Sequence, residues 1–201
     1  TVFIIGVTSI LMAISSGAPL KHALQVVVVS FAFFFGIFFL LKTFGHYLEP
    51  IIGYRYERFA GFFDPFKYAD SSGHQLVNSY YALRRGEFFG VGIGKSIQKT
   101  GYLPFPYTDF ILPIIGEEIG FFGLTIVLGA VFTLIGQIFL TASRTTRDFD
   151  SLLCIGIASM LLIQTIVNAF GVTGMLPISG VTFPFLSYGG SSLIVVSIAT
   201  G

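Results

Sequence analysis

Long apolar runs separated by short polar connections dominate the pattern of hydrophobic and polar positions along the chain. A bilayer core of about 30 Å is crossed by roughly 20 apolar helical residues. The pattern predicts complete spans at residues 22–41, 110–142 and 151–172. Residues 1–16 and the run that begins at residues 185–191 are predicted to be parts of two further spans.

The predicted spans are interpreted as helices, although residues 26–29 and 33–35 are β-branched or aromatic and would favour strands in water. Only helices and closed barrels satisfy their own backbone groups within lipid. Barrel strands alternate between apolar and polar positions, and these runs do not alternate. The expected fold is therefore an all-α polytopic transmembrane helix bundle with about five spans.

Composition agrees with a membrane protein, because 54% of the residues are hydrophobic and 10% are charged, against about 25% charged in soluble domains. The net charge of +1 provides no field that would attract nucleic acid. Cys154 is the single cysteine, which excludes a disulfide framework. Both ends fall within apolar runs, so we expect residues 1–201 to be one transmembrane unit of a longer chain.

Basic residues in the short connections predict the orientation of the spans. Lys21 and His22 flank one connection, and Arg144 and Arg147 lie in another, and the positive-inside rule places both connections in the cytoplasm. Residues 42–108 and 174–190 are then extracellular.

The extracellular loop 42–108 is longer than most structureless loops, which indicates function. It carries eight basic and five acidic residues among many aromatic ones, so we expect short interfacial helices, one of them at residues 75–85. Residues 174–190 contain two prolines and several glycines. Because irregular backbone at membrane depth must be buried in protein or line a cavity, a re-entrant-like turn is predicted there.

Asp109 stands where the basic loop meets the longest apolar run. One hypothesis is a helix cap, because an acid at this place satisfies free amide groups and suits the helix dipole. The other hypothesis is chemistry on the outer face of the membrane. Pro113 lacks the amide that would bond to the carbonyl of Asp109, so the first helical turn is predicted to be irregular.

Glu117 and Glu118 are the only charged residues between Phe110 and Ser143. Ionisable groups at membrane depth are costly and therefore indicate function. One glutamate is expected to face the same cavity as Asp109, or alternatively to pair with a basic group from another helix. Gln164 and Asn168, four residues apart, predict a polar face that forms hydrogen bonds between helices.

Glycines at 90, 92 and 94 precede Lys95 and Ser96 and invite comparison with a phosphate-binding loop. The Walker A spacing requires a glycine at position 89, where the chain has Phe89. Tight turns, or a close approach of the backbone to a lipid headgroup, are the preferred interpretation.

A set of long motifs, in a fixed order, resembles the SEDS family of shape, elongation, division and sporulation proteins, whose branches are FtsW, RodA and SpoVE. The resemblance covers essentially the whole chain and is closest to the FtsW branch. It rests on RYERFAGFFDP at 55–65, GHQL at 73–76, GVGIGKSIQK at 90–99, YLP at 102–104, TDFI at 108–111, GEE at 116–118, GMLP at 174–177 and PFLSYGGSS at 184–192.

The resemblance implies the C-terminal half of a ten-span protein in the bacterial plasma membrane. It also implies a peptidoglycan glycosyltransferase that polymerises lipid II on the extracellular face during cell division. A class B penicillin-binding protein and other division proteins are the implied partners. Asp109 matches the family's essential aspartate, whereas Phe105 stands where the family usually has a glutamate, which weakens any pairing of two carboxylates there.

The expected chemistry is glycosyl transfer with inversion, in which Asp109 acts as general base. The polyprenyl pyrophosphate leaving group requires cations. A divalent cation, Mg²⁺ or Mn²⁺, would serve that purpose, but no ligand spacing demonstrates a site. The alternatives are a flippase for the same lipid and a non-catalytic division scaffold. The candidate substrate-binding residues are Arg55, Arg58, Lys95, Lys99, Glu117, Glu118, Ser187 and Tyr188.

Overall fold

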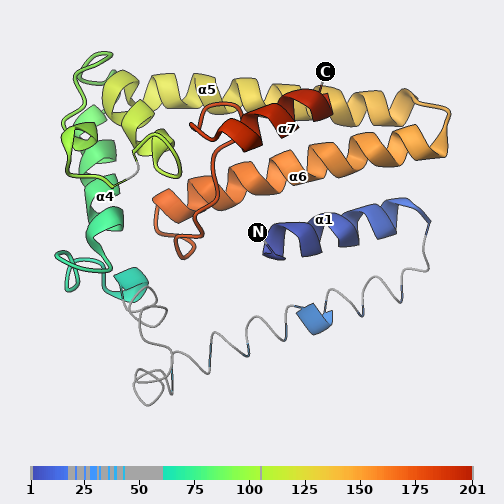
Figure 1. Cartoon of the computed structure of the whole chain (residues 1–201), viewed down its shortest axis with the longest axis horizontal. Helices are drawn as coiled ribbons and strands as arrows, with labels where there is room; N and C mark the ends of the chain where they lie inside the picture. Colours follow the sequence, from blue (N-terminus) through green and yellow to red (C-terminus); the bar gives the residue numbers. More distant parts are fainter. Residues whose placement is uncertain are drawn as a thin grey trace.

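The computed structural model describes residues 2–17, 61–104 and 106–200, with scattered positions between 21 and 43. Within these residues the regular structure is helical and contains no strand, so the all-α prediction is confirmed (Figure 1). The elements are α1 (Val2–Ser15), α4 (His74–Gly86), the short 3-10 helix η1 (Gln98–Thr100), α5 (Ile111–Arg144), α6 (Asp148–Val172) and α7 (Gly190–Thr200).

Most of the predicted spans that fall on described residues are found as helices. By length and composition, α5 and α6 can each cross a membrane. The helix expected at residues 75–85 is present as α4, and α7 begins within the predicted last span. The span predicted at residues 22–41 lies largely outside the described residues, as do Arg55, Arg58 and Phe105.

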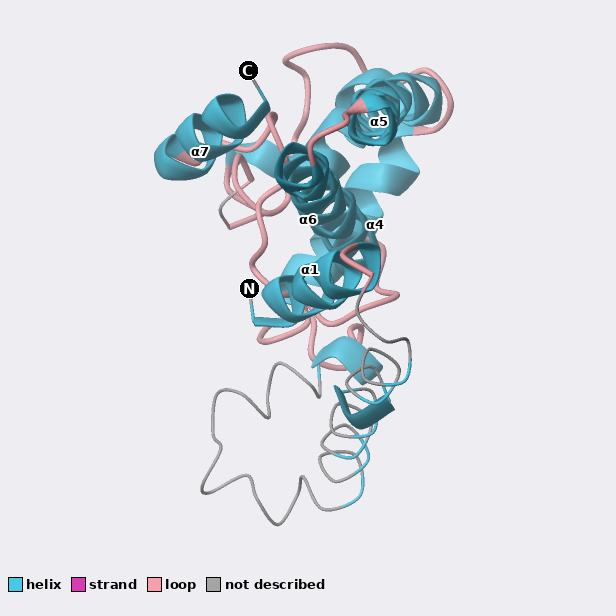
Figure 2. Ribbon diagram, turned by 90° about the vertical axis from the view of Figure 1, so that its right-hand side faces the viewer, coloured by secondary structure: helices cyan, strands magenta, loops and turns pink. Residues whose placement is uncertain are grey.

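Helix α6 lies between α1 and α5 (Figure 2). Small and branched residues make this central position favourable: Ala158 and Leu161 of α6 are fully buried. On the side of α1, Ile163 and Val167 pack with Ile4. Burial of these side chains packs α1 and α5 against opposite sides of α6.

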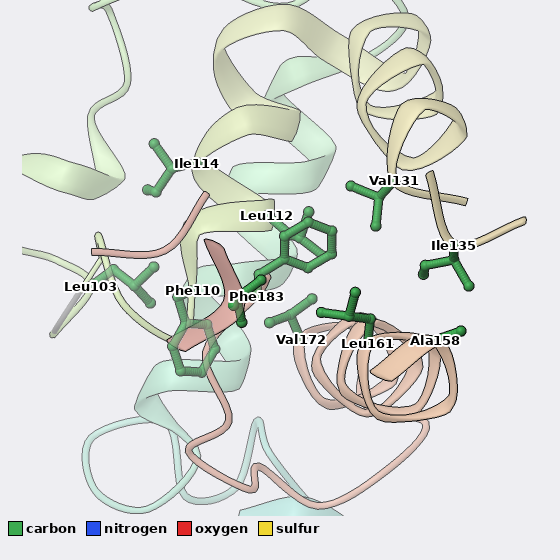
Figure 3. Packing of buried hydrophobic residues seen from close by; sticks show 11 residues of the cluster. Leu103, Phe110, Leu112, Ile114, Val131, Ile135, Ala158, Leu161, Val172 and Phe183 are labelled. Atoms are coloured by element: carbon green, nitrogen blue, oxygen red, sulfur yellow. The ribbon is translucent and has the colours of Figure 1, made fainter. Parts of the chain in front are cut away.

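A hydrophobic cluster joins α5, α6, the segment before α7 and α7 itself (Figure 3). Phe110 and Phe183 are among its largest fully buried side chains, although 73 positions of sequence separate them. Full burial of one such side chain contributes about 1.5–3 kcal/mol. The cluster thus holds the start of α5 against the C-terminal end of α6.

Helix α5 is broken at Gly120, whose φ of 72° and ψ of −174° are not helical. The long arm, residues 121–144, is about 36 Å long and is sufficient to cross a bilayer. The short arm, residues 111–119, folds toward it, because a Cβ on Gly116 would lie 3.8 Å from Leu124 Cδ2. In a straight helix those two positions are about 12 Å apart along the axis. The prediction of one continuous helix over residues 110–142 is therefore wrong.

The break leaves two amide groups of the long arm without their helical acceptors, and the loop after α4 supplies replacements. The N–H of Phe121 donates to the carbonyl oxygen of Glu87 at 2.9 Å, and that of Phe122 donates to Phe88 at 3.1 Å.

The same loop also donates to the two carbonyl groups of the short arm that would accept from Phe121 and Phe122 in an unbroken helix. The carbonyl oxygen of Glu117 accepts from the N–H of Val91 at 3.0 Å, and that of Glu118 accepts from Gly92 at 2.9 Å. The loop and the broken helix thus exchange four backbone hydrogen bonds, and no group of the set stays unsatisfied.

Glycine is required where these backbones meet. A Cβ on Gly90, which has a φ of 79°, would lie 2.2 Å from the carbonyl oxygen of Glu118. One turn earlier, a Cβ on Gly86 at the end of α4 would lie 1.8 Å from the carbonyl oxygen of Gly116. The glycines at 90, 92 and 94 all have positive φ, as the predicted tight turns require, and Gly90 also packs against the backbone of α5, whereas an approach to a lipid headgroup stays a prediction.

Helix α4 crosses one end of the α5–α6 pair (Figure 1). The Ser79 hydroxyl donates to the carbonyl oxygen of Val172 at 2.6 Å and so satisfies one of the free carbonyl groups at the end of α6. The Asn78 amide donates to the carbonyl oxygen of Tyr102 at 3.2 Å. Helix α4 is thereby joined both to α6 and to the loop that leads to Asp109.

Replacement of Gly120 by alanine should destabilise the protein by at least about 2 kcal/mol, because φ is positive there. The added Cβ would also lie 2.4 Å from the Gly90 backbone nitrogen. The measurement is the thermal unfolding midpoint in detergent. Gly129→Ala is the matched control, since it lies in the long arm with no heavy atom within 4 Å of the added carbon. Equal midpoints for the two variants would contradict this role of Gly120.

Candidate functional site

The turn that carries Asp109 is held by three consecutive backbone carbonyl groups, those of residues 107–109. Each accepts a hydrogen bond from a residue between 168 and 188, contributed by α6 or by the segment that follows it. The Tyr188 N–H donates to Tyr107 at 2.7 Å, the Ser187 hydroxyl to Thr108 at 2.5 Å, and the Asn168 amide to Asp109 at 2.8 Å.

The bond from Asn168 replaces one that the helix cannot make. Pro113 has no amide hydrogen, so the carbonyl of Asp109 has no helical donor four residues ahead. Asn168 Nδ2 supplies that donor from α6. Helix α5 begins at Ile111, with Phe110 at the N-cap position, so Asp109 itself lies in the turn before the helix.

The segment between α6 and α7 folds back along α6. Asn168 Nδ2 also donates to the carbonyl oxygen of Val181 at 2.6 Å, and Gln164 Nε2 donates to that of Thr182 at 2.8 Å. The polar face predicted for Gln164 and Asn168 therefore binds this returning segment. The re-entrant turn predicted at residues 174–190 remains a prediction as far as depth in a membrane is concerned.

A small cavity lies beside Asp109. Its lining includes Asp109, Asn168, Ser179 and Gly180, and the space of about 10 Å³ would hold one water-sized group. Asp109 is half-buried. Gly180 lies close to this carboxylate, since a Cβ on it would be 3.4 Å from Asp109 Oδ2.

A larger and mainly apolar cavity of about 350 Å³ is lined by residues that flank Asp109 in sequence, Tyr107 and Ile111. A pocket of this volume falls within the range of small-molecule sites. Its lining residues come from the Asp109 turn, the returning segment and α7: Tyr107, Ile111, Leu186, Ser187, Tyr188 and Leu193.

Glu117 is fully buried and both of its carboxylate oxygens are engaged. Oε1 accepts from Arg85 Nη1 at 3.0 Å and from the Ile97 N–H at 3.1 Å. Oε2 accepts from the Ser96 hydroxyl at 2.5 Å and from the Gln98 N–H at 3.3 Å. The stretch that invites comparison with a phosphate loop thus wraps an internal carboxylate.

Lys99 and Glu118, both predicted to bind substrate, bind each other. Lys99 Nζ lies 2.5 Å from Glu118 Oε1, and both side chains are mostly buried, at 21% and 16% exposed. Neither glutamate lines the cavity beside Asp109, so the hypothesis that one of them faces it is wrong. The alternative, pairing with a basic group of another element, is what the structure contains.

The remaining predicted substrate residues differ in their surroundings. Lys95 is exposed and forms no ion pair within the described part of the chain. Ser187 is buried, and its hydroxyl both donates to Thr108 and accepts from the Phe183 N–H at 2.7 Å. The Tyr188 side chain is 77% exposed beside the larger cavity. Arg55 and Arg58 lie outside the described residues.

Sequence reasoning missed that Asn168 and Gly180 belong to the surroundings of Asp109. The signal for Asn168 was the missing amide of Pro113, which requires some donor from elsewhere in the fold. For Gly180 no local signal existed, because the approach to Asp109 Oδ2 brings together positions 71 residues apart.

Among the described residues, no three His, Cys, Asp or Glu side chains gather as a metal site would require. The divalent cation expected from the sequence stays a prediction.

Replacing Glu117 by glutamine should destabilise the protein by about 2–3 kcal/mol. The NH₂ group of glutamine would face N–H or O–H donors in place of a carboxylate oxygen, and the charge-assisted hydrogen bonds would be lost. Glu118→Gln is the comparison variant and should cost less than Glu117→Gln, since the Glu118 side chain keeps 16% of its exposure to solvent whereas Glu117 is fully buried. Unfolding midpoints of both variants in detergent test this. A larger loss for Glu118→Gln would refute the structural role of Glu117.

Comparison with known proteins gives consistent matches. The sequence model of the cell cycle protein family FTSW_RODA_SPOVE matches residues 1–201. The chain is 44% identical over 199 residues to the probable peptidoglycan glycosyltransferase FtsW of Bacillus subtilis, covering 98% of this chain and 48% of the relative. It is 40% identical over 204 residues to the protein of the same name from Haemophilus influenzae, covering 98% and 50%.

A solved structure of a peptidoglycan synthase complex, described as coordinating polymerization and crosslinking, contains a chain of similar fold. The TM-score is 0.70 at 25% identity, covering 98% of this chain and 52% of that chain. The present sequence spans about half the length of the relatives it matches.

Proposed function

The chain belongs to the FtsW/RodA/SpoVE family of cell cycle proteins, and from that premise we propose that the whole protein polymerises lipid II into glycan strands, with Asp109 as general base. The observation that carries the proposal is the turn at residues 107–109, whose three carbonyl groups are all held by residues that lie 59 to 81 positions later in the chain. A general base must keep its position relative to the substrate, and such a turn provides that.

In the proposed step, the carboxylate of Asp109 takes the proton of the acceptor sugar's 4-hydroxyl. The hydroxyl oxygen then forms a bond to the anomeric carbon of the donor sugar. The bond from that carbon to the pyrophosphate oxygen breaks, and its electron pair leaves with the polyprenyl pyrophosphate. Attack opposite the leaving group inverts the configuration of that carbon.

The leaving pyrophosphate requires positive charge as its own negative charge develops. Lys95 is the exposed candidate of the described loop, and Arg55 and Arg58 are further candidates from the sequence. Lys99 is a weaker candidate, since Glu118 already neutralises it. The apolar cavity beside Tyr107 suits part of the polyprenyl chain of such a substrate.

An extracellular active site is supported by the positions of charges along α5 and α6. Arg144 and Arg147 flank the connection between the two helices. The carbonyl oxygen of Asp109 accepts a hydrogen bond from Asn168, which lies near the opposite end of α6. The positive-inside rule assigns the arginine end to the cytoplasm. Asp109 then lies toward the outer leaflet, where the sugars of lipid II are polymerised.

We expect a class B penicillin-binding protein to be the partner, as the sequence resemblance implies. The similar fold in a peptidoglycan synthase complex is consistent with such an assembly.

Asp109→Asn in the full-length protein should lower the rate of glycan polymerisation by about 10²–10⁴-fold, because asparagine cannot accept the proton. The assay supplies lipid II to the purified protein with its partner and measures polymer length and yield. Asp148→Asn is the matched control: Asp148 is an acid in the first turn of α6 at the opposite end, so its replacement should leave the rate unchanged. Undiminished polymer with Asp109→Asn would overturn the assignment.

A lipid transporter is the second candidate, favoured by the break in α5 and by the segment that folds back along α6. Broken helices of this kind form the binding sites of many transporters. Reconstitution of the full-length protein into vesicles distinguishes the two functions, because a transporter would move labelled lipid II between leaflets without forming polymer. A scaffold would do neither.

A further inference from the structure

We infer that Asn168 has two roles toward a sugar substrate: it positions Asp109 through Nδ2, and its Oδ1 accepts a hydrogen bond from a hydroxyl of the acceptor sugar. The inference rests on the proposed glycosyl transfer and names a further residue of that site.

The orientation of the Asn168 amide follows from its partners. Nδ2 lies 2.8 Å from the carbonyl oxygen of Asp109 and 2.6 Å from that of Val181. Carbonyl oxygens only accept hydrogen bonds, so both must face the NH₂ group. Both amide hydrogens are therefore used, and they join α6, the Asp109 turn and the returning segment at one point.

Asn168 Oδ1 is the group that remains. The side chain is 3% exposed, and Oδ1 has no hydrogen-bond partner among the described residues. A buried acceptor without a partner costs about 1–3 kcal/mol. Native proteins keep few such atoms, and those they keep are often explained by function. Of the three such buried oxygens in the described part, on Ser72, Gln98 and Asn168, the one on Asn168 belongs to a residue that lines the cavity beside Asp109.

The size of the cavity limits what can reach this oxygen. Its volume of about 10 Å³ has room for one hydroxyl-sized group and excludes a sugar ring. Carboxylate and amide oxygens near one such space are both acceptors, so they select a group that donates.

A hydroxyl carries a single proton, so the hydroxyl that gives its proton to Asp109 cannot donate to Asn168 at the same time. The Oδ1 atom therefore takes a neighbouring hydroxyl of the same sugar, which fills the cavity, and the attacking hydroxyl reaches the half-buried Asp109 from outside it. Two contacts from adjacent hydroxyls would fix the rotation of the acceptor ring and present the attacking oxygen to the base. Asn168 thus links the position of the base to that of the nucleophile.

The test uses the full-length protein with its partner, and the probes are lipid II and an analogue in which the acceptor hydroxyl next to the attacking one is replaced by hydrogen. Wild type should prefer lipid II on the order of 10-fold, because the analogue leaves Oδ1 unpaired. Asn168→Leu removes both amide functions with little change in size. It should lower kcat by about 10²-fold and use both acceptors equally well.

Gln164→Leu is the matched control. Gln164 lies one turn earlier on α6 and donates to the same returning segment, at Thr182. Gln164→Leu should lose about as much thermal stability as Asn168→Leu, while it keeps the wild-type kcat and the wild-type preference for lipid II over the analogue. Hydrogen exchange of the amides at residues 107–111 should accelerate in Asn168→Leu and not in Gln164→Leu.

The outcomes separate the two proposals. If wild type makes no polymer, or Asp109→Asn loses none, the proposed function is wrong. If those two behave as expected but wild type uses the analogue as well as lipid II, or Asn168→Leu matches Gln164→Leu in kcat and exchange, this inference alone is wrong. Should Asn168→Leu fail to fold, Asn168→Ser and the wild-type acceptor preference decide the question in the same way.

Discussion

The exchange of backbone hydrogen bonds between the broken helix α5 and the loop after α4 is the constraint on which the rest of this end of the molecule depends. A break in a membrane helix frees amide and carbonyl groups, and each group left unsatisfied in lipid costs several kcal/mol. The loop satisfies four of them at once, two of each kind. The short arm of α5 can therefore fold toward the long arm only while the loop is in place.

The buried carboxylate of Glu117 extends this arrangement. Its bonds to Arg85, Ser96 and the amides that follow tie the end of α4 and the start of η1 to the short arm. Asp109 lies in the turn just before the other end of the same arm, so its position depends on the buried Glu117 and the groups that bind it. A missing helical bond at Pro113 is then supplied from α6, which fixes the turn from the second side.

Much of this architecture could be predicted from the sequence, and the failures have physical causes. Hydropathy located α5 and α6 because burial in lipid depends on local composition. Pro113 predicted an irregular start of α5, since a missing amide is a local property. The break at Gly120 was missed because a single glycine in an apolar run is usually tolerated within a helix. Glu117 was assigned to the wrong neighbourhood because its partner Arg85 is 32 residues away, a distance over which periodicity carries no information.

The bonds that hold the Asp109 turn also set an order of events during synthesis. The donor Asn168 lies 59 residues after its acceptor Asp109, and the donor Ser187 lies 79 residues after its acceptor Thr108. A nascent chain that has completed α5 already contains the acid, the loop and Glu117, but not these donors. The acid reaches its final geometry once α6 has entered the membrane and the following segment has turned back along it. The turn is therefore fixed only after α6 and the segment that follows it have been made, and until then the three carbonyl groups at residues 107–109 lack the donors that hold them.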